Sequence, residues 1–243
     1  MHASNTAQGP GSGGLKQQAD PQAAVVSALW EGAIGRTVRC VPTRRTVQAA
    51  GPAGVVYGKW RLGHRADAEA EWRWLHLLPL LGIPCPKPVA FVGHGRRTLL
   101  VTAALPGRAL DAWAVDAARE GWLDQLVTFG IREVAPLVRR LHAHGVVFRD
   151  LYWNHVFAGD PRHGGPVALL DVERVFRPRW CWRRWVVKDL AGLRASLPVA
   201  VGVRSQLRFL AASLQRPLRD LRPWIRAILV KSERVQRHRP RFG

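Results

Sequence analysis

The fold of this chain is decided by the stretch Gly145-Val146-Val147-Phe148-Arg149-Asp150-Leu151-Tyr152-Trp153-Asn154-His155-Val156-Phe157. An apolar run leads into Arg149-Asp150, and polar residues follow four and five positions later. The same pattern returns at Leu169-Leu170-Asp171-Val172, where a short apolar run again ends in a carboxylate. Because short apolar runs of this kind are typical of buried strands, the sequence predicts two strands that each deliver an aspartate to a loop.

Two aspartates in this order are how enzymes with a protein-kinase-like fold present their phosphoryl-transfer site. The first, preceded by arginine, receives the proton of the attacking hydroxyl, and the second binds a metal ion that bridges phosphates. Taken alone, Asp150 and Asp171 each fit equally well a solvated residue that starts a turn after a strand. The interpretation therefore depends on the other parts of such a site occurring elsewhere in the chain.

A lysine occurs where a kinase fold needs one. The run 55–60, Val-Val-Tyr-Gly-Lys-Trp, follows the turn signal Gly51-Pro52-Ala53-Gly54 and the run 46–49, which predicts a hairpin with Lys59 on its second strand. The chain has 37 lysines and arginines, and lysine is rare among them. A compact ammonium at this strand position suits the α- and β-phosphates of ATP, although a lysine that merely extends to solvent is the alternative.

A helix is predicted over residues 66–81, with glutamates in its first half and apolar positions around Trp72, Leu75, Leu78 and Leu81. One glutamate on this helix can be directed at Lys59 and hold the ammonium in place. We assign this role to Glu71, with Glu69 as the second candidate. Both are otherwise ordinary solvated residues near a helix start.

The predicted helix stops at residues 82–88, where alternating prolines prevent its continuation. Residues 89–92 and 98–102 then predict a strand pair, and Leu105-Pro106-Gly107 precedes helical sequence. We interpret this tripeptide as a hinge between two lobes, against which an adenine ring would sit. The predicted fold is α+β and protein-kinase-like, with a small β-rich lobe carrying one helix (about 25–104) and a larger, mostly helical lobe (about 105–243).

The chain resembles the lipopolysaccharide core kinases, the Kdo/heptose kinase family with a protein-kinase-like fold. The segments that carry the resemblance are Glu71-Trp72-Arg73, the run 82–91, Leu105-Pro106-Gly107, Arg149-Asp150-Leu151-Tyr152 with His155 and Phe157, Leu170-Asp171, and the run 188–193, Lys-Asp-Leu-Ala-Gly-Leu. They occur in family order and span about residues 34 to 240.

The resemblance implies a role for each site residue. Asp150 is the catalytic base, Asp171 holds Mg²⁺, and Lys59 and Glu71 serve ATP binding. Arg149 and Asp189 support the catalytic loop.

Some positions depart from the protein-kinase pattern. The asparagine expected five residues after the catalytic aspartate is His155, with Asn154 one position early. Mg²⁺ prefers oxygen ligands, so whether His155, Asn154 or water completes the metal site stays open. No Ala-Pro-Glu segment precedes Asp189, which argues against an activation loop switched by phosphorylation. Between Ile34 and Thr46 there is no repeated glycine spacing, so the phosphate-covering loop is not visible in the sequence.

Composition fits one catalytic domain over residues 25–243, because 243 residues with 47% hydrophobic content can bury one sizeable core. Residues 1–24 are rich in Gly, Ser, Gln and Ala without periodicity, which predicts a disordered tail. The sequence shows neither an apolar signal core nor a run of eighteen apolar residues. We therefore expect a cytoplasmic protein.

The net charge of +20 is concentrated between Arg174 and Lys188 and again from Lys231 to Arg241. Such surfaces are attracted to anionic lipid, and Trp180, Trp182 and Trp185 suit the headgroup region. We therefore expect a peripheral position on the inner membrane and an anionic glycolipid acceptor. Basic and aromatic residues together also suit nucleic acid, but the sequence has no signature of a nucleic-acid-binding fold.

The favoured function is an ATP- and Mg²⁺-dependent kinase that acts on a sugar hydroxyl of a lipopolysaccharide core. One alternative is a catalytically silent kinase-like protein that binds a membrane or a partner. Another is a protein or small-molecule kinase on the same fold, which differs only in its acceptor. Retention of Lys59, Asp150 and Asp171 favours catalysis, since a silent protein has no need of them.

Overall fold

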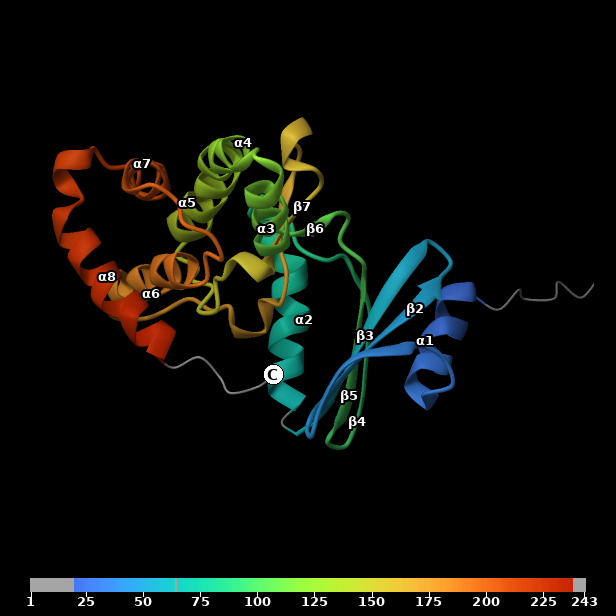
Figure 1. The fold of residues 1–243 in the computed structure, drawn as a ribbon. Coiled ribbons are helices and arrows are strands. Elements are labelled where there is room, and N and C mark those ends of the chain that lie inside the picture. The colour runs from blue at the N-terminus through green and yellow to red at the C-terminus, as the bar shows by residue number, and fades with distance from the viewer. Residues whose placement is uncertain (1–19, 64, 238–243) are drawn as a thin grey trace, which may run out of the picture.

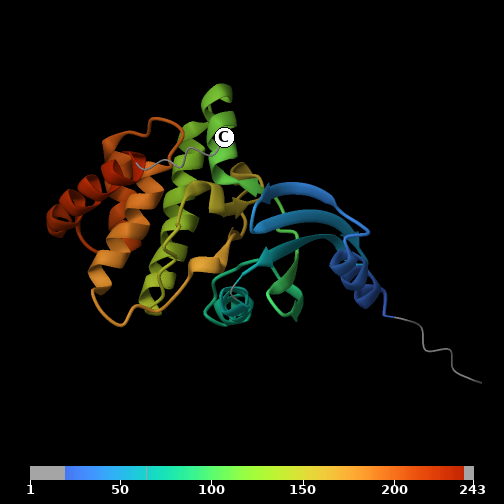
Figure 2. The same ribbon diagram turned by 90° about the horizontal axis from the view of Figure 1, so that it is seen from below.

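The computed structural model describes residues 20–63 and 65–237 and confirms the predicted two-lobed fold (Figure 1). A small lobe built on one β-sheet lies beside a larger helical lobe, and the two lobes contact one another along one edge (Figure 2).

The small lobe contains an antiparallel sheet of five strands in the spatial order β1-β2-β3-β5-β4. Its strands are β1 (Arg36–Val41), β2 (Arg44–Gly51), β3 (Gly54–Leu62), β4 (Pro88–His94) and β5 (Arg97–Ala103). The predicted hairpin is the β2–β3 pair, which turns between Gly51 and Gly54. The predicted strand pair is β4–β5. Lys59 therefore lies on β3, between β2 and β5.

A helix that the sequence analysis did not predict opens the small lobe: α1, Pro21–Glu31. The Asp20 side chain accepts a hydrogen bond from the backbone N–H of Gln22, and Pro21 occupies the first turn, which are strong start signals. Leu29 is fully buried against the sheet, in a small core with Val47, Val56, Leu99 and Val101. The prediction of disorder was thus wrong for residues 20–24, and the described part of the small lobe has two helices instead of one. Residues 1–19 of the predicted tail lie outside the described residues.

The predicted helix over 66–81 is α2, Arg65–Leu80, and it lies between the sheet and the large lobe (Figure 1). Leu75 and Leu78 on this helix are buried in the core of the large lobe. Glu71 is also buried, at 3% exposure. One face of α2 is therefore packed against the large lobe, while Glu71 is directed at Lys59 on the sheet.

The large lobe combines helices with a small three-stranded sheet. Its elements are β6 (Arg108–Ala109), α3 (Leu110–Glu120), α4 (Leu123–Phe129), a π-helical turn (Gly130–Val134), α5 (Ala135–Ala143), β7 (Val156–Ala158), β8 (Val167–Leu169), α6 (Trp182–Ala195), α7 (Val203–Leu214) and α8 (Arg222–Arg237). Short 3₁₀ turns occupy Trp153–His155, Pro161–His163, Val172–Arg174 and Leu218–Asp220.

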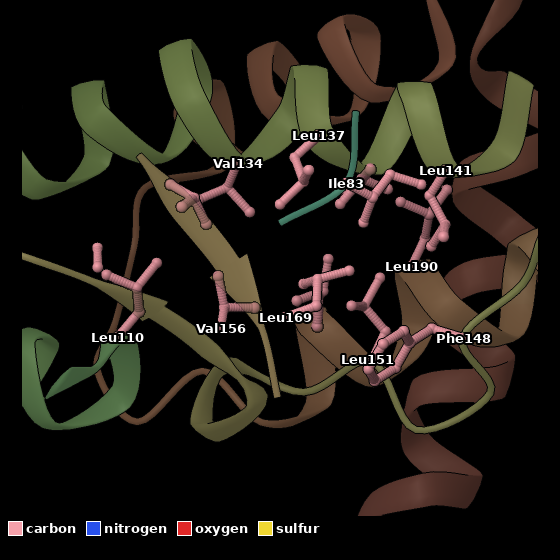
Figure 3. Close-up of a cluster of buried hydrophobic side chains, with 14 of the residues drawn as sticks. Ile83, Leu110, Val134, Leu137, Leu141, Phe148, Leu151, Val156, Leu169 and Leu190 are labelled. Carbon is pink, nitrogen blue, oxygen red and sulfur yellow. The ribbon is translucent and has the colours of Figure 1, made fainter. Parts of the chain in front are cut away.

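The apolar runs on either side of Asp150 end in the core of this lobe (Figure 3). Phe148, Leu151, Val156 and Leu169 are all fully buried. Burial of each large apolar side chain contributes about 1.5–3 kcal/mol to stability. These buried side chains hold the intervening loop at the edge of the lobe. The two aspartates are thus carried on a rigid frame.

The predicted hinge lies in the connection between β5 and β6. Gly107 has φ +85°, and a Cβ there would lie 1.9 Å from the carbonyl oxygen of Ala158 on β7. Only glycine combines this backbone conformation with such a close approach. The connection is therefore clamped against the large lobe at Gly107.

Candidate active site

The loop that carries Asp150 is braced from below by Asp189 on α6. The fully buried Asp189 carboxylate accepts hydrogen bonds from the backbone N–H groups of Phe148 (2.8 Å) and Arg149 (2.7 Å) and from Nε2 of His142 (3.1 Å). Arg149 has φ +72°, an uncommon conformation for a residue with a side chain. Strain of this kind costs about 1–3 kcal/mol and is retained where surrounding contacts enforce it. The structure thus places Asp189 against the backbone of Arg149, the two residues predicted to support this loop.

Close packing between α6 and the loop contributes to the same support. A Cβ at Gly192 would lie 2.5 Å from the carbonyl oxygen of Leu151. On the preceding turn of α6, Lys188 Nζ donates to the carbonyl oxygen of Arg149 at 2.8 Å. The helix therefore reaches the loop through its backbone and through two charged side chains.

Lys59 bridges the two lobes. Its Nζ lies 2.7 Å from Glu71 Oε1 on α2 and 2.9 Å from Asp171 Oδ1 in the large lobe. Of the two glutamates considered for the Lys59 pair, the structure places Glu71 there. Asp171 itself has φ +64°, so the second aspartate, like the loop before the first, has a strained backbone.

Lys59 and Asp171 stay ionised at neutral pH. Burial lowers the pKa of Lys59, but the charges of Glu71 and Asp171 together outweigh it, so that pKa is raised above its ordinary value. Burial by itself raises the pKa of Asp171, yet the charge and hydrogen bond of Lys59 lower it to about 2. Asp171 is therefore available as an anionic oxygen ligand, 2.9 Å from the Lys59 ammonium.

His155 connects the two aspartate-bearing segments. Its Nδ1 lies 2.8 Å from the carbonyl oxygen of Asp150, and its own carbonyl oxygen accepts from Leu170 N–H at 2.8 Å, one residue before Asp171. Because a carbonyl oxygen only accepts, Nδ1 of His155 is the donor in this hydrogen bond. Asn154 is exposed.

The oxygen atoms that this site offers as metal ligands fit a magnesium ion better than a transition metal. Within residues 20–63 and 65–237, no three His, Cys, Asp or Glu side chains are grouped so that they could hold a metal by themselves. Mg²⁺ is usually bound through one or two carboxylates, with phosphates and water supplying the remaining ligands. The ionised Asp171 and an amide oxygen such as that of Asn154 match this pattern.

Asp150 is also paired, with a residue that the sequence analysis did not single out. Arg174 Nη1 lies 3.2 Å from Asp150 Oδ1 and 2.8 Å from Oδ2. Lys188 Nζ lies 3.9 Å from Oδ1. The pKa of Lys188 is lowered to about 8, mainly by burial and against the opposing charge of Asp150. Two cations thus face the candidate base.

Further charged residues that sequence reasoning missed join the lobes near β3. Arg61 is paired with Glu71 and with Glu173 Oε1 (2.7 Å). Arg44, beside the β1–β2 turn, is paired with Glu173 Oε2 (2.8 Å). Arg61 could have been found from the sequence, because side chains alternate between the two faces of a strand and Arg61 therefore shares a face of β3 with Lys59. The β1–β2 turn, where the sequence has no repeated glycine spacing, is thereby tied to the segment after Asp171.

A braced aspartate, a metal-competent aspartate and a strand lysine paired with a helix glutamate define a phosphotransferase of the protein-kinase-like class. The chain belongs to the lipopolysaccharide kinase (Kdo/WaaP) family, whose model matches residues 57–215 and so includes every site residue described above from Lys59 to Asp189. The resemblance seen in the sequence is therefore confirmed. The chain is accordingly a kinase that phosphorylates an alcohol group of a lipopolysaccharide core sugar.

Two relatives show the extent of the similarity. The lipopolysaccharide core heptose(I) kinase WaaP of Escherichia coli is 26% identical over 225 residues, which cover 82% of this chain and 85% of the relative. The enzyme of the same name from Pseudomonas aeruginosa is 28% identical over 195 residues, which cover 72% and 71%.

Among solved structures, WaaP in complex with acyl carrier protein superimposes with a TM-score of 0.72 at 27% identity and covers 90% of this chain and 92% of that one. An aminoglycoside-3'-phosphotransferase of type VIII has a TM-score of 0.60 at 20% identity, with 87% and 96% covered. The second likeness shows the shared fold alone.

Proposed function

We propose that this chain transfers the γ-phosphate of Mg²⁺-bound ATP to a hydroxyl of a heptose or Kdo sugar in the lipopolysaccharide core. The observation that carries the proposal is Lys59, held between Glu71 at 2.7 Å and Asp171 at 2.9 Å, with Asp150 linked to the Asp171 segment through His155. Phosphoryl transfer depends mainly on positioning and charge stabilisation, and this arrangement supplies both.

Each side chain has a definite task in this proposal. Lys59 neutralises phosphate oxygens, and Glu71 holds its ammonium in place. Asp171, with Asn154 or water, would hold Mg²⁺, which supplies further charge neutralisation at the phosphates. Asp150 accepts the proton of the sugar hydroxyl as its oxygen attacks phosphorus. Asp189 keeps the Arg149–Asp150 backbone in place and takes no part in proton transfer.

The test is phosphate transfer from labelled ATP to a dephosphorylated lipopolysaccharide core, with the product located by mass spectrometry. We expect one phosphate on a heptose or Kdo residue and no transfer when Mg²⁺ is chelated. An aminoglycoside serves as the control acceptor for the small-molecule alternative. Transfer to the aminoglycoside, or to neither acceptor, would contradict the proposed substrate.

We further propose that a basic and aromatic segment, residues 177–184, attaches the enzyme to anionic lipid. Trp180 is 79% exposed and Trp182 is 37% exposed, beside the exposed Arg177, Arg179 and Arg184. Trp185, in contrast, is half-buried and packs edge-on against Phe176. Among the described residues, no helix has the length and apolar character required to cross a bilayer.

Changing Arg177, Arg179 and Arg184 together to glutamine is expected to weaken binding to vesicles containing anionic lipid by about a hundredfold, at about 1 kcal/mol per basic residue near the surface. The matched control changes Arg204, Arg208 and Arg219, which are equally exposed but lie outside the segment. Sedimentation with vesicles measures both. Equal weakening by the two triple variants would mean that total charge, and not this segment, controls binding.

We also propose an acyl carrier protein as a partner, because a structural relative was solved in complex with one. The large lobe has a cavity of about 360 Å³ between α3, α4, α6, α7 and α8, lined mainly by apolar side chains that include Leu126, Ile131, Phe209, Leu210 and Ile228. This volume lies in the range of ligand pockets. An acyl chain is apolar and therefore suits a cavity with this lining.

Acylated carrier protein is expected to raise the melting temperature, because a ligand at a hundred times its Kd adds about 2.7 kcal/mol of stability, which corresponds to roughly 5–10 °C for a chain of this size. Calorimetric melting with and without the carrier measures the shift. The same carrier protein without its acyl group is the control. An equal shift with both would exclude the cavity as the acyl site.

A further inference from the structure

The Asp150 carboxylate is covered by one guanidinium. A single nitrogen of Arg174, Nη1, contacts both carboxylate oxygens, at 3.2 and 2.8 Å. A sugar hydroxyl that donates to Asp150 has to compete with this guanidinium, because Nη1 already contacts both carboxylate oxygens. Arg174 is therefore a competitor of the acceptor hydroxyl for the Asp150 carboxylate.

The contact between Arg174 and Asp150 can be broken at a small cost in free energy. Arg174 is 45% exposed and Asp150 is 20% exposed at the side chain, and ion pairs at such positions contribute only about 0–1 kcal/mol. Lys188, in contrast, is fixed by its hydrogen bond to the carbonyl oxygen of Arg149 and stays 3.9 Å from Asp150. When Arg174 leaves, Lys188 still provides a positive charge beside the carboxylate.

A competing anion would draw Arg174 away, and its position indicates which anion. On the nucleotide side, Lys59 pairs with Glu71 and Asp171, whereas Arg174 pairs with Asp150, where the acceptor hydroxyl has to bind. A guanidinium suits planar carboxylates and phosphates because it presents several N–H donors in a fixed geometry. The anion that fits is an acidic group on the acceptor itself, near the hydroxyl that is phosphorylated.

We propose that Arg174 is a specificity-determining residue that covers Asp150 until an acidic group of the acceptor binds it and uncovers the base. The proposal rests on the proposed function and adds a substrate requirement, since the acceptor must carry a carboxylate or phosphate close to its reactive hydroxyl. It also predicts that transfer of phosphate from ATP to water is slow in the absence of an acceptor. Without an acceptor, Asp150 is not free to receive a proton from water.

The test compares the wild type with Arg174→Met, which removes every donor at similar length, and with Arg174→Lys, which keeps the charge. Two acceptors are used: a dephosphorylated core oligosaccharide with its carboxylates, and the same oligosaccharide after reduction of those carboxylates to alcohols. For Arg174→Met we expect the KM of the acidic acceptor to rise about ten- to a hundredfold, the size of a hydrogen bond to a charged group. The KM of ATP should stay at the wild-type value, and Arg174→Lys should recover part of the loss.

Carboxylate reduction should weaken the acceptor for the wild type by a similar factor and have little effect on Arg174→Met. ATP hydrolysis without acceptor should increase severalfold in Arg174→Met. The control is Arg219→Met, at a side chain that is 86% exposed on the 3₁₀ turn before α8, and it should match the wild type in every assay.

Several results would overturn the proposal. An unchanged acceptor KM in Arg174→Met, or equal losses on both acceptors, would make Arg174 a neighbour without a role in specificity. A rise in the KM of ATP alone would identify the anion as a nucleotide phosphate. If the wild type phosphorylates neither oligosaccharide, the proposed function itself fails, whereas hydrolysis that is unchanged in Arg174→Met refutes the cover of Asp150 independently of any acceptor.

Discussion

Replacing Asp150 with asparagine is expected to lower kcat for phosphate transfer by about 10²–10⁴-fold, the usual contribution of a positioned general base, while ATP binds almost as in the wild type. The amide keeps the size of the carboxylate and cannot accept the proton of the sugar hydroxyl. The nucleotide side of the site should be unaffected, because its lysine, Lys59, is held by Glu71 and Asp171. Calorimetry of ATP binding and a steady-state transfer assay measure the two properties separately.

The Asp150 experiment has a matched control in Asp160→Asn. Asp160 is a second ionised aspartate, whose pKa is lowered to about 2 chiefly by hydrogen bonds from Arg162. It lies in the turn after β7 and takes no part in the site. Its asparagine variant should transfer phosphate at the wild-type rate. If Asp150→Asn also kept the wild-type rate, Asp150 would not be the base.

Replacing Asp171 with asparagine is expected to weaken binding of Mg²⁺-ATP by about 10²–10³-fold, since a metal ion that neutralises phosphate charge is worth several kcal/mol. Turnover should fall as well. The substitution removes the anionic oxygen that Mg²⁺ requires and leaves Lys59 with one counter-charge, Glu71, in place of two. The loss of Mg²⁺-ATP affinity should therefore be larger than the loss caused by replacing Asn154, an exposed and uncharged candidate ligand.

The Asp171 measurement is calorimetric titration with ATP in the presence of Mg²⁺ and again with the metal chelated. Wild-type affinity should depend strongly on the metal, and the affinity of Asp171→Asn should depend on it little. Asp160→Asn again controls for loss of one carboxylate, and a melting curve shows that each variant is folded. Metal-dependent binding of wild-type strength in Asp171→Asn would mean that another residue holds the ion.

The two predictions differ in what they report about the enzyme. In the proposed function Asp150 acts when the hydroxyl attacks, so its loss should appear in kcat, whereas Asp171 acts in the ground state as well, so its loss should also appear in binding. A catalytically silent kinase-like protein would show neither effect. The pair of variants therefore tests the assignment of roles within a site whose family is known.

Local pattern predicted the elements of the site because each element has a short-range cause. Turn residues at Gly51–Gly54 fixed a hairpin that carries Lys59, and the periodicity of 66–81 located the helix that carries Glu71. Buried apolar runs before Asp150 and Asp171 placed both carboxylates at loops. The failure at α1 has an equally local origin, because its short Ala- and Val-rich sequence follows a Gly-rich segment and lacks a polar face to reveal its period.

The sequence by itself therefore determined the residue types, the strands and helices that carry them, and the order of the parts, which follow from turn chemistry, periodicity and the limits on proline. Only the tertiary structure decided the partners. Lys59 and Asp171 are 112 positions apart, Arg44 and Glu173 are 129 apart, and Arg174 meets Asp150 across a gap of 24. A local pattern states which face a side chain occupies, but the charge opposite that face is chosen by how the two lobes and the loops of the core pack together. That packing, acting over the whole chain, turned a set of candidate residues into a site with a lysine held between two carboxylates and a base covered by an arginine.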